Sequence, residues 1–327
     1  MSEGSTRSGA QRRIIDIGNM HLEVAELGDG PLVVLLHGFP ESWYSWRHQM
    51  APLAAAGYRV VAPAQRGYGR SDAPPAVDAY TQLHLVGDLI GLLDGLGEST
   101  AVIVGHDWGA PVAWNAAALR PDRFRAVVGM SVPFYGIQRS TAPPTAGMAE
   151  LARDRFVYIL YFQEPGEAEA ELEADVRATL RRMMYSISGD IPESRFWNRP
   201  VGSTFLDTTI EPDNLPAWLS DDDLDVFTAE FERSGFRGGL NYYRNIDRNA
   251  ELMAPFAGRT VEQPAMFIGG ERDIVLGATP ETVERMRGVV PGLRRIEWLA
   301  GCGHWLQQER PADVNRLLLE FLGDLDR

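Results

Sequence analysis

Short apolar runs bounded by polar residues, glycine or proline alternate along the chain with longer helical patterns. The strand-like runs are Leu32–Leu36, Arg59–Ala62, Ala101–Val104, Ala126–Met130 and Ala265–Ile268. They are continuous rather than alternating, as is typical of strands buried on both faces of a parallel sheet. Helical patterns lie between them, for example at Asp88–Leu96 and Pro111–Leu119. This order predicts an α/β fold.

The middle of the chain departs from this alternation. From about Phe134 to Asn245 strand-like runs are scarce, and helices are predicted over Met148–Phe162 and Glu171–Met184. Ser220, followed by three aspartates, predicts a capped helix start. The chain is therefore divided into a disordered tail at 1–11, an α/β core at 12–133 and 246–327, and a helical insertion at 134–245.

Composition narrows the classes of partner. The 327 residues include 45 acidic and 31 basic side chains, a net charge of −14. This charge disfavours binding to nucleic acid or to anionic membranes, and no apolar run approaches the ~20 residues of a membrane helix. The single Cys302 excludes an intrachain disulfide and fits a reducing compartment. We expect a cytoplasmic protein, monomeric or homodimeric.

The sharpest local feature is the stretch Val104-Gly-His-Asp-Trp-Gly109. A predicted strand runs into a turn flanked by small residues, and Pro111 then opens a helix. This is the spacing of a nucleophile elbow, which displays one side chain at the edge of the sheet. The displayed residue here is Asp107, whose carboxylate can attack carbon and form an ester.

A catalytic elbow also needs an oxyanion hole. The turn His37-Gly-Phe-Pro40 follows the first buried strand, where this type of fold offers one backbone N–H. A second comes from the residue after the nucleophile. The predicted donors are the amides of Phe39 and Trp108.

The base and its supporting acid follow from chain order. His304 lies in a glycine-rich loop after an apolar run, beyond the carboxyl edge of the sheet. His106 is interpreted as structural, and His37 as a hydrogen-bonding scaffold. Asp273 follows a buried run and precedes His304, the order in which the fold's triad occurs. Glu271 is the nearest rival but falls too early in its loop.

Together these segments resemble the soluble α/β-hydrolase-fold epoxide hydrolases. The resemblance rests on HGFPESWYSWR, QRGYGRSD, GHDWG, YILYFQEPG, GGLNYYRN and GHWLQQERP, which run from His37 to Pro311. It implies a mostly parallel eight-stranded sheet with a helical cap, and conversion of an epoxide to a vicinal diol through an aspartyl ester. It implies no metal or organic cofactor.

The resemblance also assigns residues of the pocket. Two cap tyrosines, matching Tyr158 and Tyr243, are expected to donate protons to the epoxide oxygen, with Tyr161 and Tyr242 as local rivals. The predicted substrate contacts are Phe39, Trp108, Tyr158, Tyr243 and Trp305. Ala64 stands where the family usually has Asp, so we expect a change in local hydrogen bonding. Ile159 is expected to change the pocket.

Two other functions fit part of this pattern. A haloalkane dehalogenase uses the same triad, and Trp108 could bind its halide. The pair of cap tyrosines favours an epoxide, because an alkoxide needs a proton and a halide does not. A non-catalytic small-molecule receptor on this fold would be expected to have lost part of the triad, yet Asp107, Asp273 and His304 are all present.

Overall fold

A computed structural model of the chain describes residues 9–192, 199–275 and 278–325. Its centre is an eight-stranded sheet with the order β1-β2-β4-β3-β5-β6-β7-β8. The strands are β1 (Gln11–Asp16), β2 (His21–Leu27), β3 (Leu32–Leu36), β4 (Arg59–Pro63), β5 (Ala101–His106), β6 (Phe124–Met130), β7 (Ala265–Gly270) and β8 (Leu293–Leu299). In the sheet order from β4 through β3 and on to β8, every pair of neighbouring strands is parallel. β2 pairs antiparallel with both β1 and β4. The predicted mostly parallel sheet is confirmed.

The five strand-like runs coincide with β3 to β7, and the apolar run before His304 is the end of β8, whereas β1 and β2 were missed. In β1 only one residue of six is buried, and Arg12 and Arg13 interrupt the apolar pattern. β2 contains Glu23, which is buried and ion-paired with Arg12 and Arg70, so neither strand forms a continuous apolar run in the sequence. Ala10 is buried and Gln11 already pairs with Glu26. Most of the tail predicted at 1–11 lies outside the described residues.

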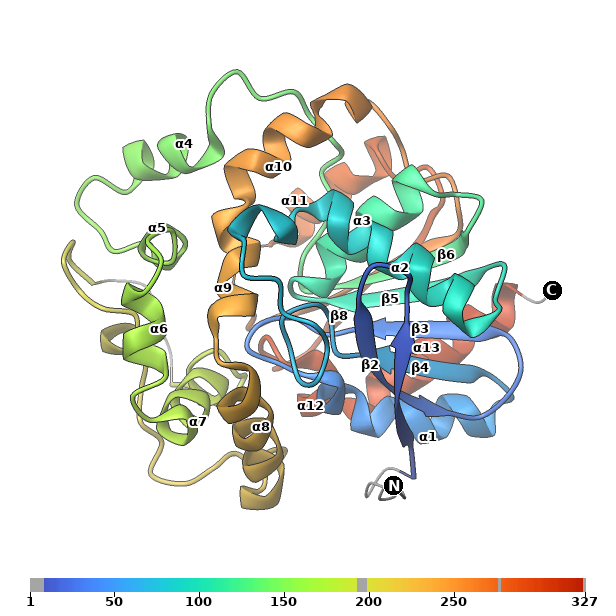
Figure 1. Cartoon of the computed structure of the whole chain (residues 1–327), viewed down its shortest axis with the longest axis horizontal. Coiled ribbons are helices and arrows are strands. Elements are labelled where there is room, and N and C mark those ends of the chain that lie inside the picture. The colour runs from blue at the N-terminus through green and yellow to red at the C-terminus, as the bar shows by residue number, and fades with distance from the viewer. Residues whose placement is uncertain (1–8, 193–198, 276–277, 326–327) are drawn as a thin grey trace.

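Helices cover both faces of the sheet (Figure 1). The helices α2 (Gln82–Leu96) and α3 (Gly109–Leu119) pack together on one face, and α1 (Arg47–Ala55) and α13 (Pro311–Leu325) on the other. The remaining core helices are α11 (Pro280–Glu284) and α12 (Leu306–Glu309). Short 3₁₀ helices occupy Trp43–Trp46, Val77–Tyr80, Leu206–Thr208, Ala254–Phe256 and Arg285–Gly288.

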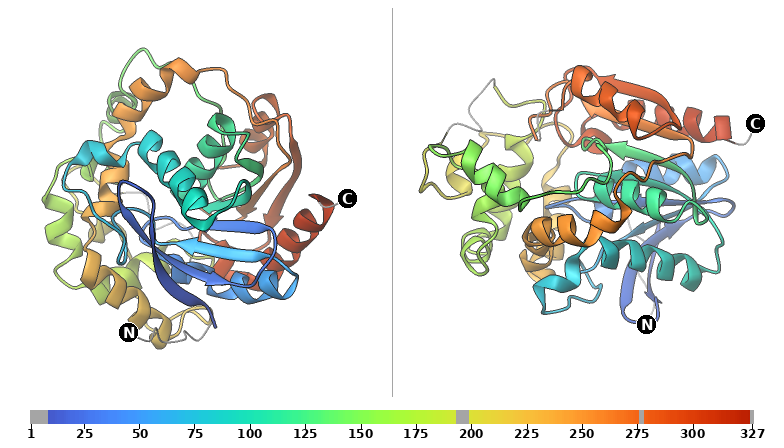
Figure 2. Two further views of the ribbon diagram at one scale, coloured as in Figure 1. Left: turned by 45° about the vertical axis from the view of Figure 1, so that its right-hand side comes forward. Right: turned by 90° about the horizontal axis from the view of Figure 1, so that it is seen from above.

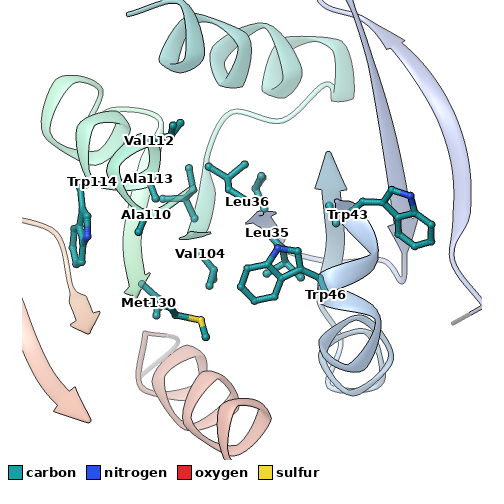
Figure 3. Close-up of a cluster of buried hydrophobic side chains, with 14 of the residues drawn as sticks. Leu35, Leu36, Trp43, Trp46, Val104, Ala110, Val112, Ala113, Trp114 and Met130 are labelled. Atoms are coloured by element: carbon teal, nitrogen blue, oxygen red, sulfur yellow. The ribbon is translucent and has the colours of Figure 1, made fainter. Parts of the chain in front are cut away.

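The apolar core lies between the sheet and these helices (Figure 3). Strand residues such as Leu35 and Val104 are fully buried, as are the indoles of Trp46 and Trp114. Gly129 lets β6 pass close to Trp114, because a Cβ there would lie 2.3 Å from the indole. A rigid sheet of this kind holds the loops at its carboxyl edge in fixed positions.

The helices between β6 and β7 form a separate layer beside the core (Figures 1 and 2), which we call the cap. They are α4 (Pro144–Leu151), α5 (Tyr158–Tyr161), α6 (Glu167–Leu172), α7 (Val176–Ser186), α8 (Asp221–Ser234), α9 (Arg237–Arg244) and α10 (Ile246–Met253). The capped start of α8 is confirmed, because the Ser220 hydroxyl accepts from the Asp223 amide. The exact limits predicted for this insertion, 134–245, stay a prediction.

Two helices predicted in the cap are each broken. The stretch Met148–Phe162 contains the end of α4 and the four-residue α5, separated where Phe156 donates its amide to the Arg199 carbonyl in an extended pairing. The stretch Glu171–Met184 divides at Asp175, whose side chain accepts from the Ala178 amide and starts α7. Local side-chain capping and a contact distant in sequence thus override helical periodicity.

Among the described residues, none of the helices combines the length and apolar character needed to cross a membrane.

Candidate active site

The elbow at the end of β5 places Asp107 at the carboxyl edge of the sheet. Asp107 has φ of 49°, a left-handed conformation that costs a non-glycine residue about 1–3 kcal/mol. The small neighbours are required by space: a Cβ at Gly105 would lie 2.1 Å from the Gly109 carbonyl oxygen, and one at Gly109 would lie 2.3 Å from that of Leu36. The elbow predicted from the sequence is thus observed.

The loop after β3 contacts the nucleophile directly. The Phe39 amide donates a 2.7 Å hydrogen bond to Oδ1 of Asp107. A Cβ at Gly38 would lie 2.3 Å from Asp107, so this loop can approach only with glycine there. Trp108, the second predicted donor, is the N-cap residue of α3, and its amide lies at the positive end of that helix.

His304 lies between two carboxylates. Its Nδ1 is 3.1 Å from Oδ2 and 3.2 Å from Oδ1 of Asp273, and its Nε2 is 3.5 Å from Oδ2 of Asp107. The structure therefore brings together Asp107, His304 and Asp273 as the sequence predicted. Because Asp273 occupies Nδ1, Nε2 is the nitrogen that faces the nucleophile.

The charges of this triad are strongly coupled. Burial disfavours the imidazolium of His304, but Asp273 and Asp107 outweigh burial and raise the pKa of His304 to about 10. Burial likewise opposes ionisation of Asp273, yet His304 and Ser131 hold the pKa of Asp273 below its usual value. Resting His304 is therefore a cation at neutral pH, paired with both carboxylates.

Two cap tyrosines face the nucleophile from above. Tyr158 of α5 and Tyr243 of α9 have ring centroids 5.8 Å apart, and both line the cavities that contain Asp107. The Trp108 and Tyr243 rings pack edge to face, with centroids 4.9 Å apart. Burial raises the pKa of both phenols, so each stays neutral and can donate its proton.

Two cavities meet at Asp107, Tyr158, Tyr243 and Val275. The larger, about 150 Å³, is otherwise lined by Trp108, Pro111, Val132, Met148, Ile159 and Ile246. The smaller, about 30 Å³, is otherwise lined by Phe39, Pro40, Phe162, Met183, Ile187, Phe205 and His304. Both walls are mainly apolar, and the few polar groups converge on Asp107, an arrangement typical of a small-molecule site.

Other residues named from the sequence lie outside these cavities. Trp305 is fully buried, donates its indole N–H to the Met184 carbonyl, and packs on the His304 ring with centroids 4.8 Å apart. The Tyr242 hydroxyl donates to the Arg66 carbonyl. Tyr161 lines neither cavity, and its ring packs against Phe156 with centroids 5.6 Å apart.

Ala64 and Ile159, the two residues that depart from the family pattern, differ in their distance from the site: only Ile159 lines a cavity. Ala64 is buried, and its carbonyl accepts a 2.5 Å hydrogen bond from the Ser71 hydroxyl. It does not line either cavity. Ile159, on α5, does line the larger cavity, which also contains Asp107.

Sequence reasoning missed several contributors. The Ser131 hydroxyl, at the end of β6, donates to the His304 carbonyl at 3.2 Å. Ser131 has φ of 65°, a conformation that no local pattern revealed. Val275 and Met148 line the cavities from loops and helices whose packing sequence spacing does not show. Among the described residues no group of three or more His, Cys, Asp or Glu side chains could hold a metal ion.

Comparison with known proteins gives one consistent result. The α/β-hydrolase-fold family model matches residues 31–311. The chain is 48% identical over 318 residues to epoxide hydrolase A of Mycobacterium tuberculosis, covering 96% of this chain and 98% of that protein. It is 43% identical to an epoxide hydrolase of Caballeronia sordidicola, and the alignment covers 97% of this chain and 95% of that protein.

Solved structures agree. An epoxide hydrolase from an endophytic Streptomyces superposes with a TM-score of 0.93 at 46% identity, covering 97% of this chain and 96% of the other. Epoxide hydrolase A from Mycobacterium thermoresistibile superposes with a TM-score of 0.89 at 48% identity, and the superposition covers 96% of this chain and 98% of the other.

Proposed function

The chain belongs to the α/β-hydrolase-fold epoxide hydrolases, and we propose that it opens its epoxide through a covalent ester on Asp107. The observation that carries this mechanism is the position of one carboxylate between His304 and the two cap phenols, inside an apolar cavity. Nucleophile, base and proton donors are then all within one small site.

In the first step Asp107 attacks a ring carbon. Its Oδ1 is held by the Phe39 amide, so Oδ2 forms the new C–O bond while the ring C–O bond breaks. Tyr158 and Tyr243 donate hydrogen bonds to the departing oxygen, and one of them transfers its proton. Negative charge grows on that oxygen in the transition state, which is therefore stabilised more than the ground state.

In the second step water hydrolyses the ester. Formation of the ester removes the charge of Asp107, one of the two carboxylates that raise the pKa of His304. His304 can then release its proton, which restores the neutral phenol, and accept one from water. The Phe39 and Trp108 amides stabilise the oxyanion that forms on Oδ1. The C–O bond to the substrate then breaks and the proton left on the attacking hydroxyl passes to the departing oxygen, which releases the diol and regenerates the Asp107 carboxylate with protonated His304.

The cavities define the kind of epoxide. A cavity of about 150 Å³ with apolar walls can hold a group the size of benzene. The cavity of about 30 Å³ on the other side of Asp107 accepts only a small substituent. We therefore propose an apolar epoxide with one phenyl-sized or comparable alkyl substituent and one small or absent substituent.

The dehalogenase alternative is separable by chemistry. The indole of Trp108, which could bind a halide, packs edge-on against the Tyr243 ring with centroids 4.9 Å apart. A chloroalkane of matching size should release no chloride, whereas styrene oxide should be converted to its diol. The opposite result would favour the dehalogenase.

Trapping the ester tests the mechanism. In His304→Gln the first step keeps its nucleophile but the second loses its base, so the adduct should accumulate with the mass of one epoxide. Peptide mapping should locate the adduct at Asp107. A folded His304→Gln protein that binds styrene oxide but never acquires this mass contradicts the ester mechanism.

We also propose a cytoplasmic location and a monomeric or homodimeric state. The support for the location is the single cysteine, Cys302, which is buried. Cell fractionation and sedimentation measurements test these two points.

A further inference from the structure

One buried carboxylate that the proposed mechanism does not use joins the cap to the loop that contains the base. Glu309, the last residue of α12, is 8% exposed and follows the loop of His304, which we call the base loop. Its Oε2 accepts hydrogen bonds from the Gly189 amide at 2.9 Å and from the Gly303 amide at 2.8 Å. Its Oε1 accepts from the Trp305 amide at 3.0 Å. The first of these amides belongs to the cap, and the other two flank the base.

The cap segment at residues 187–191, which follows α7, contacts both loops of the triad. The His304 amide donates to the Ile187 carbonyl at 2.9 Å. The Arg272 guanidinium donates to the Ile191 carbonyl at 2.6 Å, and Arg272 directly precedes the supporting acid in the chain. The backbone positions of the base and of its supporting acid are therefore both tied to this one segment of the cap.

The cap segment and the base loop are too close for a side chain to fit between them. A Cβ at Gly303 would lie 2.2 Å from the Gly189 amide nitrogen, and one at Gly189 would lie 2.3 Å from the Gly301 carbonyl oxygen. The segment is also part of the pocket, because Ile187 lines the smaller cavity together with His304. A shift of this segment would thus move the base and one wall of the pocket together.

The contact requires an acceptor on both oxygens of Glu309. A backbone N–H can only donate, and the three amides are divided between the two oxygens. Burial raises the pKa of Glu309, and the three amides oppose this effect. A glutamine at this position would turn its NH₂ group toward at least one amide, which would then have no acceptor.

We infer that Glu309 is a positioning residue that holds the base loop against the cap segment 187–191, so that the position of the cap fixes that of His304. Glu309 lines neither cavity, so it acts through the loop and not on the substrate. The inference rests on the proposed two-step mechanism. Attack by Asp107 uses the phenols of α5 and α9 and needs no base, whereas hydrolysis of the ester needs His304. Loss of the contact should therefore slow the second step more than the first.

Hydrogen exchange at backbone amides measures the contact without turnover. In Glu309→Ala the amides of Gly189, Gly303 and Trp305 lose their acceptor. Exchange at all three should become at least about tenfold faster, as expected for the loss of a hydrogen bond to a charged group. Unchanged exchange at Gly189 in a folded Glu309→Ala protein overturns the contact between base loop and cap, whatever the chemical mechanism.

The role of the contact is tested with two variants, one on each side of it. Glu309→Gln keeps the shape of the side chain, and Gly189→Ala pushes the cap segment away from the base loop. Small displacements of catalytic groups cost up to about a hundredfold in rate, so ester hydrolysis in single turnovers of styrene oxide should slow by about 10- to 100-fold in both. Ester formation should slow by less than about threefold, so that the ester accumulates and is seen by intact mass. Equal slowing of both steps, or of neither, contradicts the positioning role.

Glu230→Gln is the matched control. Glu230 of α8 is also a buried glutamate that joins the cap to the core, but among the described residues its carboxylate pairs with Arg12 of β1, at 2.7 Å, and not with either triad loop. This variant should lower thermal stability and leave the ratio of the two rates unchanged. A shifted ratio would mean that any loosening of the cap produces the effect, which contradicts a specific role of Glu309. Failure of the proposed mechanism is distinguishable, because no ester would then form even in His304→Gln.

Discussion

Removing the hydroxyl of either cap tyrosine perturbs only the oxygen that leaves the carbon. In Tyr158→Phe and Tyr243→Phe the ring stays in the cap, so the cavity beside Asp107 keeps its shape. One hydrogen bond to the developing alkoxide is lost in each variant. The first step should slow while the second step, which uses His304, should not.

The structure sets the expected magnitude. A hydrogen bond to a charged group contributes about 1.5–3 kcal/mol, which corresponds to about a 10- to 150-fold decrease in the rate of ester formation. The double variant should be slower than either single one, because both phenols serve the same oxygen.

Single-turnover mixing with styrene oxide, quenched with acid at successive times, measures ester formation through the intact mass of the protein. Tyr242→Phe and Tyr161→Phe are matched controls, because neither tyrosine lines the cavities and the Tyr242 hydroxyl donates to the Arg66 carbonyl. Ester formation at the unaltered rate in the double variant would refute the role of the phenols. Equal losses in the controls would refute the assignment of Tyr158 and Tyr243.

The other predictions concern the triad and the pocket. Asp273→Asn removes the carboxylate that orients His304 and raises its pKa, so ester hydrolysis should fall by about 10²- to 10⁴-fold with accumulation of ester, as measured by intact mass; an unchanged rate would show that Asp273 has no such role. Ile159→Trp should fill part of the larger cavity and raise KM for styrene oxide more than for propylene oxide; equal changes would place the phenyl group elsewhere. The pKa of His304 is raised from 6.5 to about 10, so the stability from its ion pairs is complete below pH 6.5 and lost as pH rises through about 10. Thermal unfolding should therefore show a larger loss between neutral pH and pH 10 in the unaltered protein than in His304→Gln, and parallel curves would contradict this.

The sequence was most informative where local constraints are strong. Continuous apolar runs located the buried strands, because a strand covered on both faces leaves no place for polar residues. The elbow was visible because only glycine fits at Gly105 and Gly109, where a Cβ would overlap backbone atoms. Chain order then paired Asp273 with His304, which lie 3.1 Å apart.

The sequence was least informative where contacts between residues far apart in the chain decide the structure. The break between α4 and α5 depends on Phe156 pairing with Arg199, which periodicity does not reveal. Tyr158 and Tyr243 were assigned by resemblance alone, since spacing cannot show which face of a cap helix meets the core. The contact of Glu309 with the cap needed coordinates, because Gly189 lies 120 residues away in sequence.

The origin of the oxygen in the diol tests the ester at Asp107 most directly. A single turnover is run with enzyme in excess over styrene oxide, in water enriched in heavy oxygen. If Asp107 attacks the carbon, the first diol carries the carboxylate's ordinary oxygen, and the heavy oxygen appears in Asp107 and in the diol of later turnovers. A first diol that already contains heavy oxygen would mean that water attacks the epoxide directly.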